Sequence, residues 1–292
     1  MFSYVSAIYD CLYRGKRYED ECHELIKFVH ESISEMPTMS DNLKLIDVGC
    51  GTGNHLVNLS GPGIDTYGID PSSEMIAIAN QKCHGLSNPP RFQVSELFEF
   101  NDKGFDVVLM MFHVFNYLLV QYPAKLIFEK VAELLLTDAR FGPENPNSKK
   151  KFFIFDMWDG EKINEFYFED QYMEFKCNEA LWIRKSQYEH DSNLKSVKVK
   201  YQFSKNNLKL SSSVNENIHS HSIFESAPLS TNQQNDFEEE HNLRYCLDKD
   251  IRDSANQIFE ILDSATTMNA LPSLHNSRSR VYILSPLRKS SK

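Results

Sequence analysis

The sequence predicts an α/β protein whose main sheet is parallel and covered by helices on both faces. Strand and helix patterns alternate from residue 43 to residue 157, which is the mark of a parallel sheet. A glycine-rich turn directly follows the first predicted strand. After residue 180 polar and apolar residues alternate instead, so a second, antiparallel sheet is expected there.

Apolar periodicity and turn residues place the elements of the first half. Residues 19–33 carry apolar side chains at helical spacing, and the run 105–112 is apolar enough for a strand covered on both faces. Ser72 or Ser73 is suited to cap the helix that follows Pro71. The expected order is helix 19–33, strand 43–48, a helix from 54, strand 66–69, helix 71–79, strand 91–94, strand 105–112, helix 123–136 and strand 152–157.

The second half has a different pattern. Three antiparallel strands are expected at 180–190, 194–203 and 236–246, and residues 204–235 are so rich in Ser, Asn, Gln and His that a long disordered loop is expected. A helix over 250–265 and a last strand over 280–284 complete the prediction. The expected division is an N-terminal helical cap (1–40), a Rossmann-like core (41–160), an inserted antiparallel sheet (161–246), and a C-terminal helix and strand that complete the core (247–292).

Composition restricts the class of protein. The 292 residues include 41 acidic and 31 basic side chains, and the net charge of −10 argues against a nucleic-acid partner. No apolar run reaches the roughly 18 residues of a membrane span. The six cysteines never form Cys-x-x-Cys, and the chain starts without a positively charged leader, so reduced thiols and a cytoplasmic location are expected.

The strongest chemical signal is the run Asp-Val-Gly-Cys-Gly-Thr-Gly from Asp47 to Gly53. Gly49, Gly51 and Gly53 permit a tight turn and let a ligand approach the backbone closely. Asp70 comes 17 residues after Gly53, at the end of the next strand, where a carboxylate can accept both hydroxyls of a ribose. This pattern predicts a nucleoside site at the carboxyl ends of the strands; the alternative is a glycine turn without a ligand.

Charge distinguishes between the nucleoside cofactors. The dinucleotide fingerprint G-x-G-x-x-G would require a third glycine where Asn54 stands. Asp47 would repel a pyrophosphate, but its carboxylate suits the ammonium group of S-adenosylmethionine, which carries no phosphate. S-adenosylmethionine is therefore the predicted cofactor, and a nicotinamide dinucleotide is the alternative.

These residues also resemble a known superfamily. Residues 47–53, 68–70 and 105–108 are similar to the class I S-adenosylmethionine-dependent methyltransferases, over about residues 43–157. The resemblance implies a seven-stranded Rossmann-like sheet, with Asp70 on the ribose and the glycine loop on the methionine moiety. It places Glu96 at the adenine amino group, where many members have Asp, and the neighbouring Leu97 is also expected to bind the cofactor. Tyr18 is expected to cover the methionine end, with core packing as the alternative.

A narrower resemblance concerns the acceptor. Residues 9–18, 112–118, 155–158 and 239–245 are similar to methyltransferases that N-methylate amino sugars on nucleotide carriers. In that group an antiparallel sheet inserted after strand 5 covers the substrate. This chain departs from the group in its long insert 204–235 and in its loop 137–150, and both departures concern the acceptor rather than the cofactor.

Two residues are the candidate catalytic groups. His113 follows the fourth strand at the carboxyl edge, where a histidine can act as general base, with simple pocket lining as the alternative. The resemblance places Tyr13 next to the methyl group, with core packing as the alternative. Trp158 is a candidate acceptor wall. For a diphosphate carrier the basic candidates are Lys149–Lys151, otherwise a solvated loop, and Arg184 or Lys185; no metal site is predicted.

The predicted function is S-adenosylmethionine-dependent methylation of a small molecule, with an amino group of a nucleotide-linked sugar as the favoured acceptor. An O-methyltransferase and a non-catalytic adenosyl-binding partner subunit are the alternatives. Neither nucleic acid nor membrane is an expected partner, and the sequence leaves a homodimer open.

Overall fold

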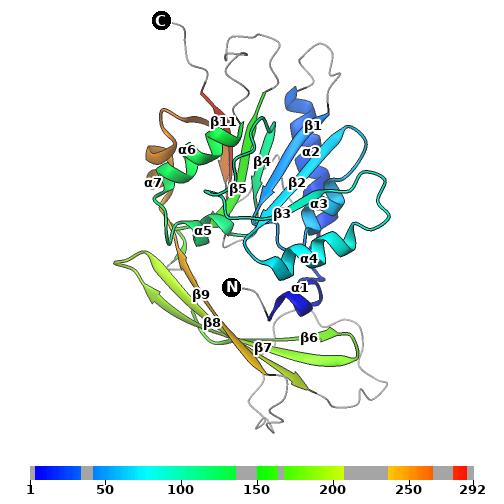
Figure 1. The fold of residues 1–292 in the computed structure, drawn as a ribbon. Coiled ribbons are helices and arrows are strands. Elements are labelled where there is room, and N and C mark those ends of the chain that lie inside the picture. Colours follow the sequence, from blue (N-terminus) through cyan, green and yellow to red (C-terminus); the bar gives the residue numbers. More distant parts are fainter. Residues whose placement is uncertain are drawn as a thin grey trace, which may run out of the picture.

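The computed structural model describes residues 4–33, 42–135, 150–163, 168–206, 236–265 and 279–287. These residues form a seven-stranded sheet covered by helices and a separate four-stranded sheet below it (Figure 1). Most of the predicted polar loop 204–235 and nearly all of the loop 137–150 lie outside the described residues.

The large sheet confirms the predicted Rossmann-like architecture. Its strands are β1 (Leu43–Val48), β2 (Ile64–Asp70), β3 (Arg91–Val94), β4 (Val107–Met110), β5 (Phe152–Trp158), β10 (Phe259–Ala265) and β11 (Ser279–Pro286). Their order is β10-β11-β5-β4-β1-β2-β3. The five strands β1 to β5 are parallel, and β11 runs antiparallel to both β5 and β10.

Helices cover both faces of this sheet (Figure 1). The strand side chains alternate between the two faces. On β5, Phe152 and Ile154 belong to one core cluster and Phe153 and Phe155 to the other. The first cluster includes side chains of α2 (Tyr18–Ile33), α3 (Asn54–Leu59) and α4 (Ser73–Lys82). The second includes side chains of α5 (Val114–Leu118), α6 (Ala124–Leu135) and α7 (Asp248–Ala255). The predicted Ser72 cap is confirmed, because its side chain accepts the Met75 amide N–H.

The second sheet, here called the cover sheet, is an antiparallel meander. Its strands, in spatial as well as chain order, are β6 (Gln171–Cys177), β7 (Ala180–Asp191), β8 (Ser196–Asn206) and β9 (Phe237–Arg244). Three were predicted, and β6 was not. The short helix α1 (Ser6–Leu12) lies between this sheet and the core (Figure 1). Val5, Ile8 and Leu12 pack there with Met75 of α4 and Phe203 of β8.

One predicted element is wrong. Residues 250–265 are not a single helix, because α7 ends at Ala255 and the chain turns into strand β10. Asn256 caps the helix and Gln257 has a left-handed φ of 72°, which interrupts the helical path. The apolar residues from Phe259 onward then pair with β11. Sheet pairing thus overrides a helical apolar pattern. Helix α5 was also not predicted.

Two of the six cysteines are not the reduced thiols that the sequence predicted. Cys11, at the end of α1, and Cys177, at the end of β6, form a disulfide, whereas the sequence predicted six reduced thiols. Among the other cysteines Cys22, Cys50 and Cys83 are buried free thiols and Cys246 is a half-buried one. The disulfide joins residues 166 positions apart and links the N-terminal helix to the cover sheet.

Reducing this disulfide should lower the free energy of unfolding by about 2–5 kcal/mol, because a long loop regains its entropy in the unfolded chain. The measurement is a denaturant melt with and without dithiothreitol. The Cys11→Ser, Cys177→Ser double variant is the matched control and should be insensitive to dithiothreitol. A melt of the wild-type chain that does not respond to the reductant would contradict the prediction.

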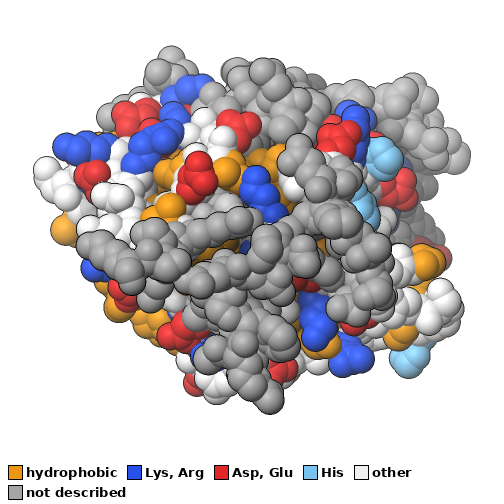
Figure 2. Space-filling model, turned by 90° about the horizontal axis from the view of Figure 1, so that it is seen from above, with side chains coloured by type: hydrophobic (Ala, Val, Ile, Leu, Met, Phe, Trp, Pro, Cys, Tyr) orange, Lys and Arg blue, Asp and Glu red, His pale blue; other side chains and the backbone are white. Residues whose placement is uncertain are grey.

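Acidic and basic side chains are intermixed on the face of the molecule that Figure 2 shows from above. Lys and Arg lie among Asp and Glu there rather than apart from them. Within the described ranges, no helix combines the length and the apolar character that crossing a membrane requires.

Candidate active site

The turn between β1 and α3 follows the predicted glycine pattern. Gly49 has a φ of 72°, and a Cβ built on it would lie 2.6 Å from Cγ2 of Val114, so only glycine fits. Gly51 also has a left-handed φ, of 53°, but nothing lies within 4 Å of the position of its Cβ. The turn is therefore packed against α5 on one side and open next to Gly51, where a ligand can approach the backbone. Gly53 follows at the start of α3.

Asp70 ends β2 and binds this turn. Its Oδ2 accepts the Gly51 N–H at 3.0 Å, and its Oδ1 accepts the Ser72 N–H at 2.9 Å. Burial raises the pKa of Asp70, and these two backbone hydrogen bonds oppose the rise. A carboxylate has about four acceptor positions, so each oxygen keeps one for a ligand hydroxyl.

Asp47 ends β1 with a carboxylate that lacks a full set of partners. Its side chain is almost fully buried, and Oδ2 has no hydrogen-bond partner among the described residues. The nearest basic group is Nδ1 of His55, 4.0 Å from Oδ2. Burial raises the pKa of Asp47 to about 7. A buried carboxylate without a partner is costly, and it suits a cationic ligand that arrives from outside the protein.

His55 begins a chain of polar side-chain contacts that sequence reasoning missed. Its Nε2 lies 3.0 Å from Glu21 of α2, and Glu21 pairs with the Lys16 ammonium group. The ring of Tyr18 contacts His55 edge-to-face at 5.0 Å between centroids, so Tyr18 packs against this network. His55 stands two residues after the last loop glycine, which is the one sequence signal that could have drawn attention to it.

Glu96 and Leu97, which follow β3, differ in exposure. Glu96 is exposed, which leaves its carboxylate accessible for an adenine amino group. Leu97 is buried in the core cluster with Ile69 and Phe100, so its side chain does not face the site. The backbone of Ser95 is anchored by its N–H to the Asp70 carbonyl at 3.1 Å.

Asp10 of α1 joins the N-terminal helix to the glycine turn. Its Oδ1 accepts hydrogen bonds from Thr52 at 2.6 Å and Asn54 at 3.0 Å, and its Oδ2 pairs with Lys82 at 2.6 Å. The sequence pattern did not single out this aspartate. The contacts place α1 directly over the loop, so the next turn of chain, which carries Tyr13, lies near the same edge of the sheet.

His113 lies at the carboxyl end of β4 in an unusual backbone conformation. Phe112 and His113 both have left-handed φ angles, of 66° and 65°, which are uncommon for residues other than glycine and occur often at functional sites. The His113 N–H donates to Asp156 Oδ1 at 3.0 Å, and its Nε2 lies 2.6 Å from Ser279 Oγ. Burial lowers the pKa of His113, which Asp156 opposes and Lys16 reinforces, so the ring is neutral at neutral pH.

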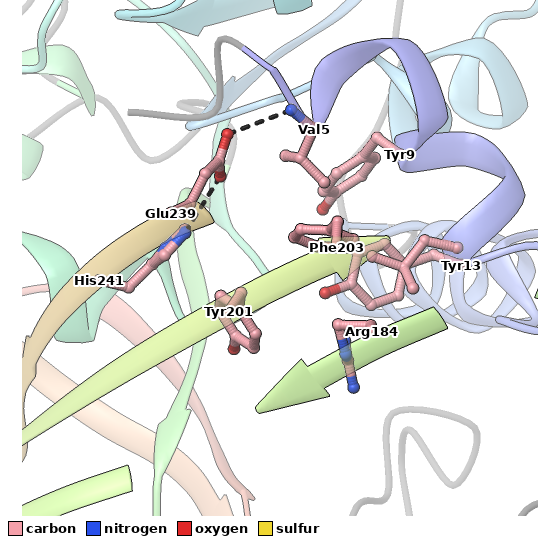
Figure 3. A pocket seen from close by; sticks show the side chains of 9 residues that line it. Val5, Tyr9, Tyr13, Arg184, Tyr201, Phe203, Glu239 and His241 are labelled. Carbon is pink, nitrogen blue, oxygen red and sulfur yellow. Dashed lines mark hydrogen bonds and ion pairs between the residues drawn. The ribbon is translucent and has the colours of Figure 1, made fainter. Parts of the chain in front are cut away.

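A small pocket lies between α1 and the cover sheet (Figure 3). Tyr13 lines it and also contacts Phe112 edge-to-face at 4.9 Å between ring centroids, next to His113. His113 itself does not line the pocket. The ring of Phe112 contacts both Tyr13 and His113, and in this way the two catalytic candidates lie near one another. The lining residues are Val5, Tyr9, Leu12, Tyr13, Arg184, Tyr201, Phe203, Glu239 and His241.

The other acceptor-side candidates have different surroundings. The ring centroid of Trp158 lies 6.1 Å from that of His113, so it stands at this edge of the core. Lys151 donates to the Phe105 carbonyl at 2.6 Å and pairs with Asp106, which ties it to the core rather than to a ligand. Lys185 pairs with Asp170 on the cover sheet. Arg184 lines the pocket, and its buried Nε has no hydrogen-bond partner within the described ranges.

The residues present fit S-adenosylmethionine. Asp47 offers an ammonium group a buried oxygen, Oδ2, that has no hydrogen-bond partner among the described residues. Gly51 leaves open space at the backbone, and Asp70 keeps acceptor capacity for a ribose. Among the residues that the structure describes, no group of three or more His, Cys, Asp or Glu side chains is placed to hold a metal ion.

Sequence comparison identifies the same region. Residues 45–137 match the family described as methyltransferase domain. A protein of Geobacillus sp. (strain WCH70) that is named as a methyltransferase is 33% identical over 96 residues, which cover 32% of this chain and 39% of that protein. The match thus spans about two fifths of the length of that curated relative.

Structural comparison extends over nearly the whole chain. A S-adenosylmethionine-dependent methyltransferase from Clostridium acetobutylicum ATCC 824 superimposes with a TM-score of 0.63 at 20% identity, covering 96% of both chains. CalS10, an amino pentose methyltransferase from Micromonospora echinaspora, gives a TM-score of 0.63 at 14% identity, covering 96% of this chain and 97% of that one. The chain therefore has the Rossmann-like fold of the S-adenosylmethionine-dependent methyltransferases.

Proposed function

We propose that this protein is an S-adenosylmethionine-dependent methyltransferase that acts on a small molecule. The observation that carries the proposal is the carboxyl edge of the large sheet. There Asp47, a buried carboxylate whose Oδ2 has no hydrogen-bond partner among the described residues, stands next to a glycine turn that is open at Gly51 and held by Asp70. Only a ligand that is cationic at one end and rich in hydroxyls at the other uses all three features.

The cofactor would lie along this edge. Asp47 and the turn of Gly49, Gly51 and Gly53 would hold the methionine moiety, and Tyr18 would cover it. Asp70 would accept the ribose hydroxyls. Glu96 would face the adenine amino group, with Leu97 contributing its backbone because its side chain is buried. When bound, the cofactor supplies a methyl group on a sulfonium, which is a good leaving group.

The protein's part in such a transfer is alignment and exclusion of water. Residues 1–40 would form the cap and residues 161–246 the cover over the acceptor. Tyr13 would orient the acceptor from the pocket wall. His113, neutral because burial lowers its pKa, would accept a proton at the carboxyl edge.

The favoured acceptor is an amino group on a nucleotide-linked sugar. A separate four-stranded sheet next to the core favours an acceptor that is held between the two sheets. The Nε–H of Arg184, which has no hydrogen-bond partner among the described residues, would donate to a carrier phosphate. CalS10, with which the chain superimposes over 96% of its length, is itself an amino pentose methyltransferase. A hydroxyl acceptor is the second candidate.

Replacing His113 with Asn should lower kcat by about 10²-fold, the usual contribution of a general base. Asparagine is the matched replacement because it tolerates the left-handed φ of 65° at this position. Calorimetry should find an unchanged dissociation constant for S-adenosylhomocysteine. A kcat and pH–rate profile like those of the wild type would contradict the role as base and leave His113 as a wall of the site.

The proposal is tested by binding and turnover. Calorimetry with S-adenosylmethionine and with NAD should detect binding of the first only. The protein is then incubated with cofactor labelled in its methyl group and with cell extract, and the labelled small molecule is identified by mass. Binding of NAD alone would overturn the proposal. Tight cofactor binding with no transfer to any amine or hydroxyl would favour a non-catalytic partner subunit.

A further inference from the structure

Three consecutive glutamates on β9 have different surroundings. Glu238 and Glu240 face outward and pair with Lys200 at 2.8 Å and Lys198 at 2.9 Å on β8. Because strand side chains alternate, Glu239 faces the opposite way, into the pocket between the cover sheet and α1 (Figure 3). The outer pair is ordinary cross-strand charge pairing, so Glu239 is the member that needs a separate explanation.

Glu239 is partly buried, and each of its carboxylate oxygens has one partner. Its side chain is 9% exposed. The Val5 N–H donates to Oε1 at 3.1 Å, and His241 Nε2 lies 3.3 Å from Oε2. Arg184 lines the same pocket, yet no ion pair joins it to Glu239 among the described contacts. A carboxylate has about four acceptor positions, so these two contacts leave room on both oxygens for a cationic ligand.

His241 and Tyr117 fix the orientation of this carboxylate. The Tyr117 hydroxyl lies 2.8 Å from His241 Nδ1. Burial raises the pKa of Tyr117 well above its usual range, so this hydroxyl keeps its proton and can share a hydrogen bond with Nδ1. The other ring nitrogen, Nε2, lies next to Glu239. The two contacts hold the Glu239 carboxylate in one orientation toward the pocket.

Aromatic rings form the walls around Glu239. Tyr201 stands directly opposite it in the β8–β9 register, and Tyr9 and Tyr13 reach the pocket from the N-terminal segment (Figure 3). The guanidinium of Arg184 lies 5.3 Å from the centre of the Tyr201 ring, so this ring already contacts one cation. A carboxylate surrounded by tyrosine rings is the chemistry that recognises an ammonium group.

We propose that Glu239 first binds the methyl acceptor as an ammonium ion and thereby makes the protein select amines over hydroxyls, with His241 and Tyr117 as its positioning residues. Before methyl transfer the bound nitrogen gives one proton to His113, the base of the proposed function, so that its lone pair is free to attack the methyl carbon. This inference rests on the proposed function. It goes beyond it by assigning to one carboxylate the choice between a nitrogen and an oxygen acceptor, and it narrows the acceptor to a molecule that carries a primary or secondary amine.

The test uses a pair of six-membered rings of the same shape, cyclohexylamine and cyclohexanol. Each is titrated by NMR into protein saturated with S-adenosylhomocysteine, near neutral pH where the amine is an ammonium ion. The wild type should bind the amine at least about tenfold more tightly than the alcohol. Glu239→Gln should abolish this preference, and Tyr117→Phe should reduce it several-fold while alcohol binding stays the same.

Glu238→Gln is the matched control, since it removes a neighbouring charge that faces outward, and it should keep the preference. Equal binding of amine and alcohol by the wild type, or an unchanged preference in Glu239→Gln, would overturn the inference. Calorimetry of S-adenosylhomocysteine on the same samples separates this result from the proposed function. Failure of the wild type to bind that ligand counts against the methyltransferase itself, whereas intact binding without amine preference counts only against Glu239. Thermal melts confirm that the variants are folded.

Discussion

Replacing Asp47 with Asn should stabilise the ligand-free protein at about pH 8 while abolishing most of its cofactor affinity. Burial raises the pKa of Asp47 from 3.8 to about 7, which corresponds to roughly 4 kcal/mol of cost for the ionised side chain. Asparagine has nearly the same shape and carries no charge. The free energy of unfolding in denaturant should therefore rise by up to that amount.

The sign of the effect depends on pH. Below about pH 4 Asp47 is protonated in both the folded and the unfolded chain, so the variant gains nothing. As the pH rises from about 4 to 7 the unfolded chain ionises and the folded chain does not, and the folded wild type loses stability progressively. Above about pH 7 the cost is complete. A variant no more stable than the wild type at about pH 8 would contradict the assignment of a buried, unpaired carboxylate.

Cofactor affinity should move in the opposite direction. An ammonium group binds the ionised carboxylate, so S-adenosylmethionine should bind the Asp47→Asn variant at least about tenfold more weakly by calorimetry. A protein that gains stability and loses its ligand at one position would show that Asp47 is retained for binding, because functional sites keep groups that cost stability.

Replacing Asp70 with Ala should weaken cofactor binding by roughly 1–3 kcal/mol, since the ribose hydroxyls lose a charged acceptor. The substitution should also cost folding stability, because the Gly51 and Ser72 N–H groups lose their hydrogen-bond acceptor. The glycine turn should therefore loosen as well, and stability should fall. Calorimetry and denaturant melts measure the two effects separately.

Asp65→Ala is the matched control on the same strand. Asp65 lies at the start of β2, away from the turn, and its carboxylate accepts a hydrogen bond from Asn42. Its replacement should leave cofactor affinity unchanged. If Asp70→Ala also binds the cofactor with unchanged affinity, Asp70 does not hold the ribose and only ties the turn together.

Much of the core could be predicted because its signals are local. The strand 91–94 was predicted with the bounds that β3 has, and the glycine spacing indicated the turn after β1. Residues 250–265 could not be predicted in the same way. Their apolar spacing fits a helix, yet pairing with β11 makes the second half a strand. The Cys11–Cys177 disulfide was missed for a related reason, since 166 residues separate the two thiols and no local pattern connects them.

The site shows the same division. Asp47, Gly49, Gly51 and Asp70 lie within one strand–turn–helix–strand unit, so their spacing alone predicts that they meet at one edge. His55 and Asp10 were missed because their partners come from other elements. His55 contacts Glu21 of α2, and Asp10 of α1 accepts a hydrogen bond from Thr52 of the glycine loop.

The sequence by itself determined the α/β core, the nucleoside edge and the charge of the ligand expected there, because these depend on residues close together in the chain. Only the tertiary structure decided the acceptor side. Glu238, Glu239 and Glu240 are chemically identical in the sequence, and strand alternation sends two to solvent and one into a pocket built from α1, β7, β8 and β9. Burial then separates their chemistry, since a carboxylate in water and a carboxylate among tyrosine rings differ in what they can bind.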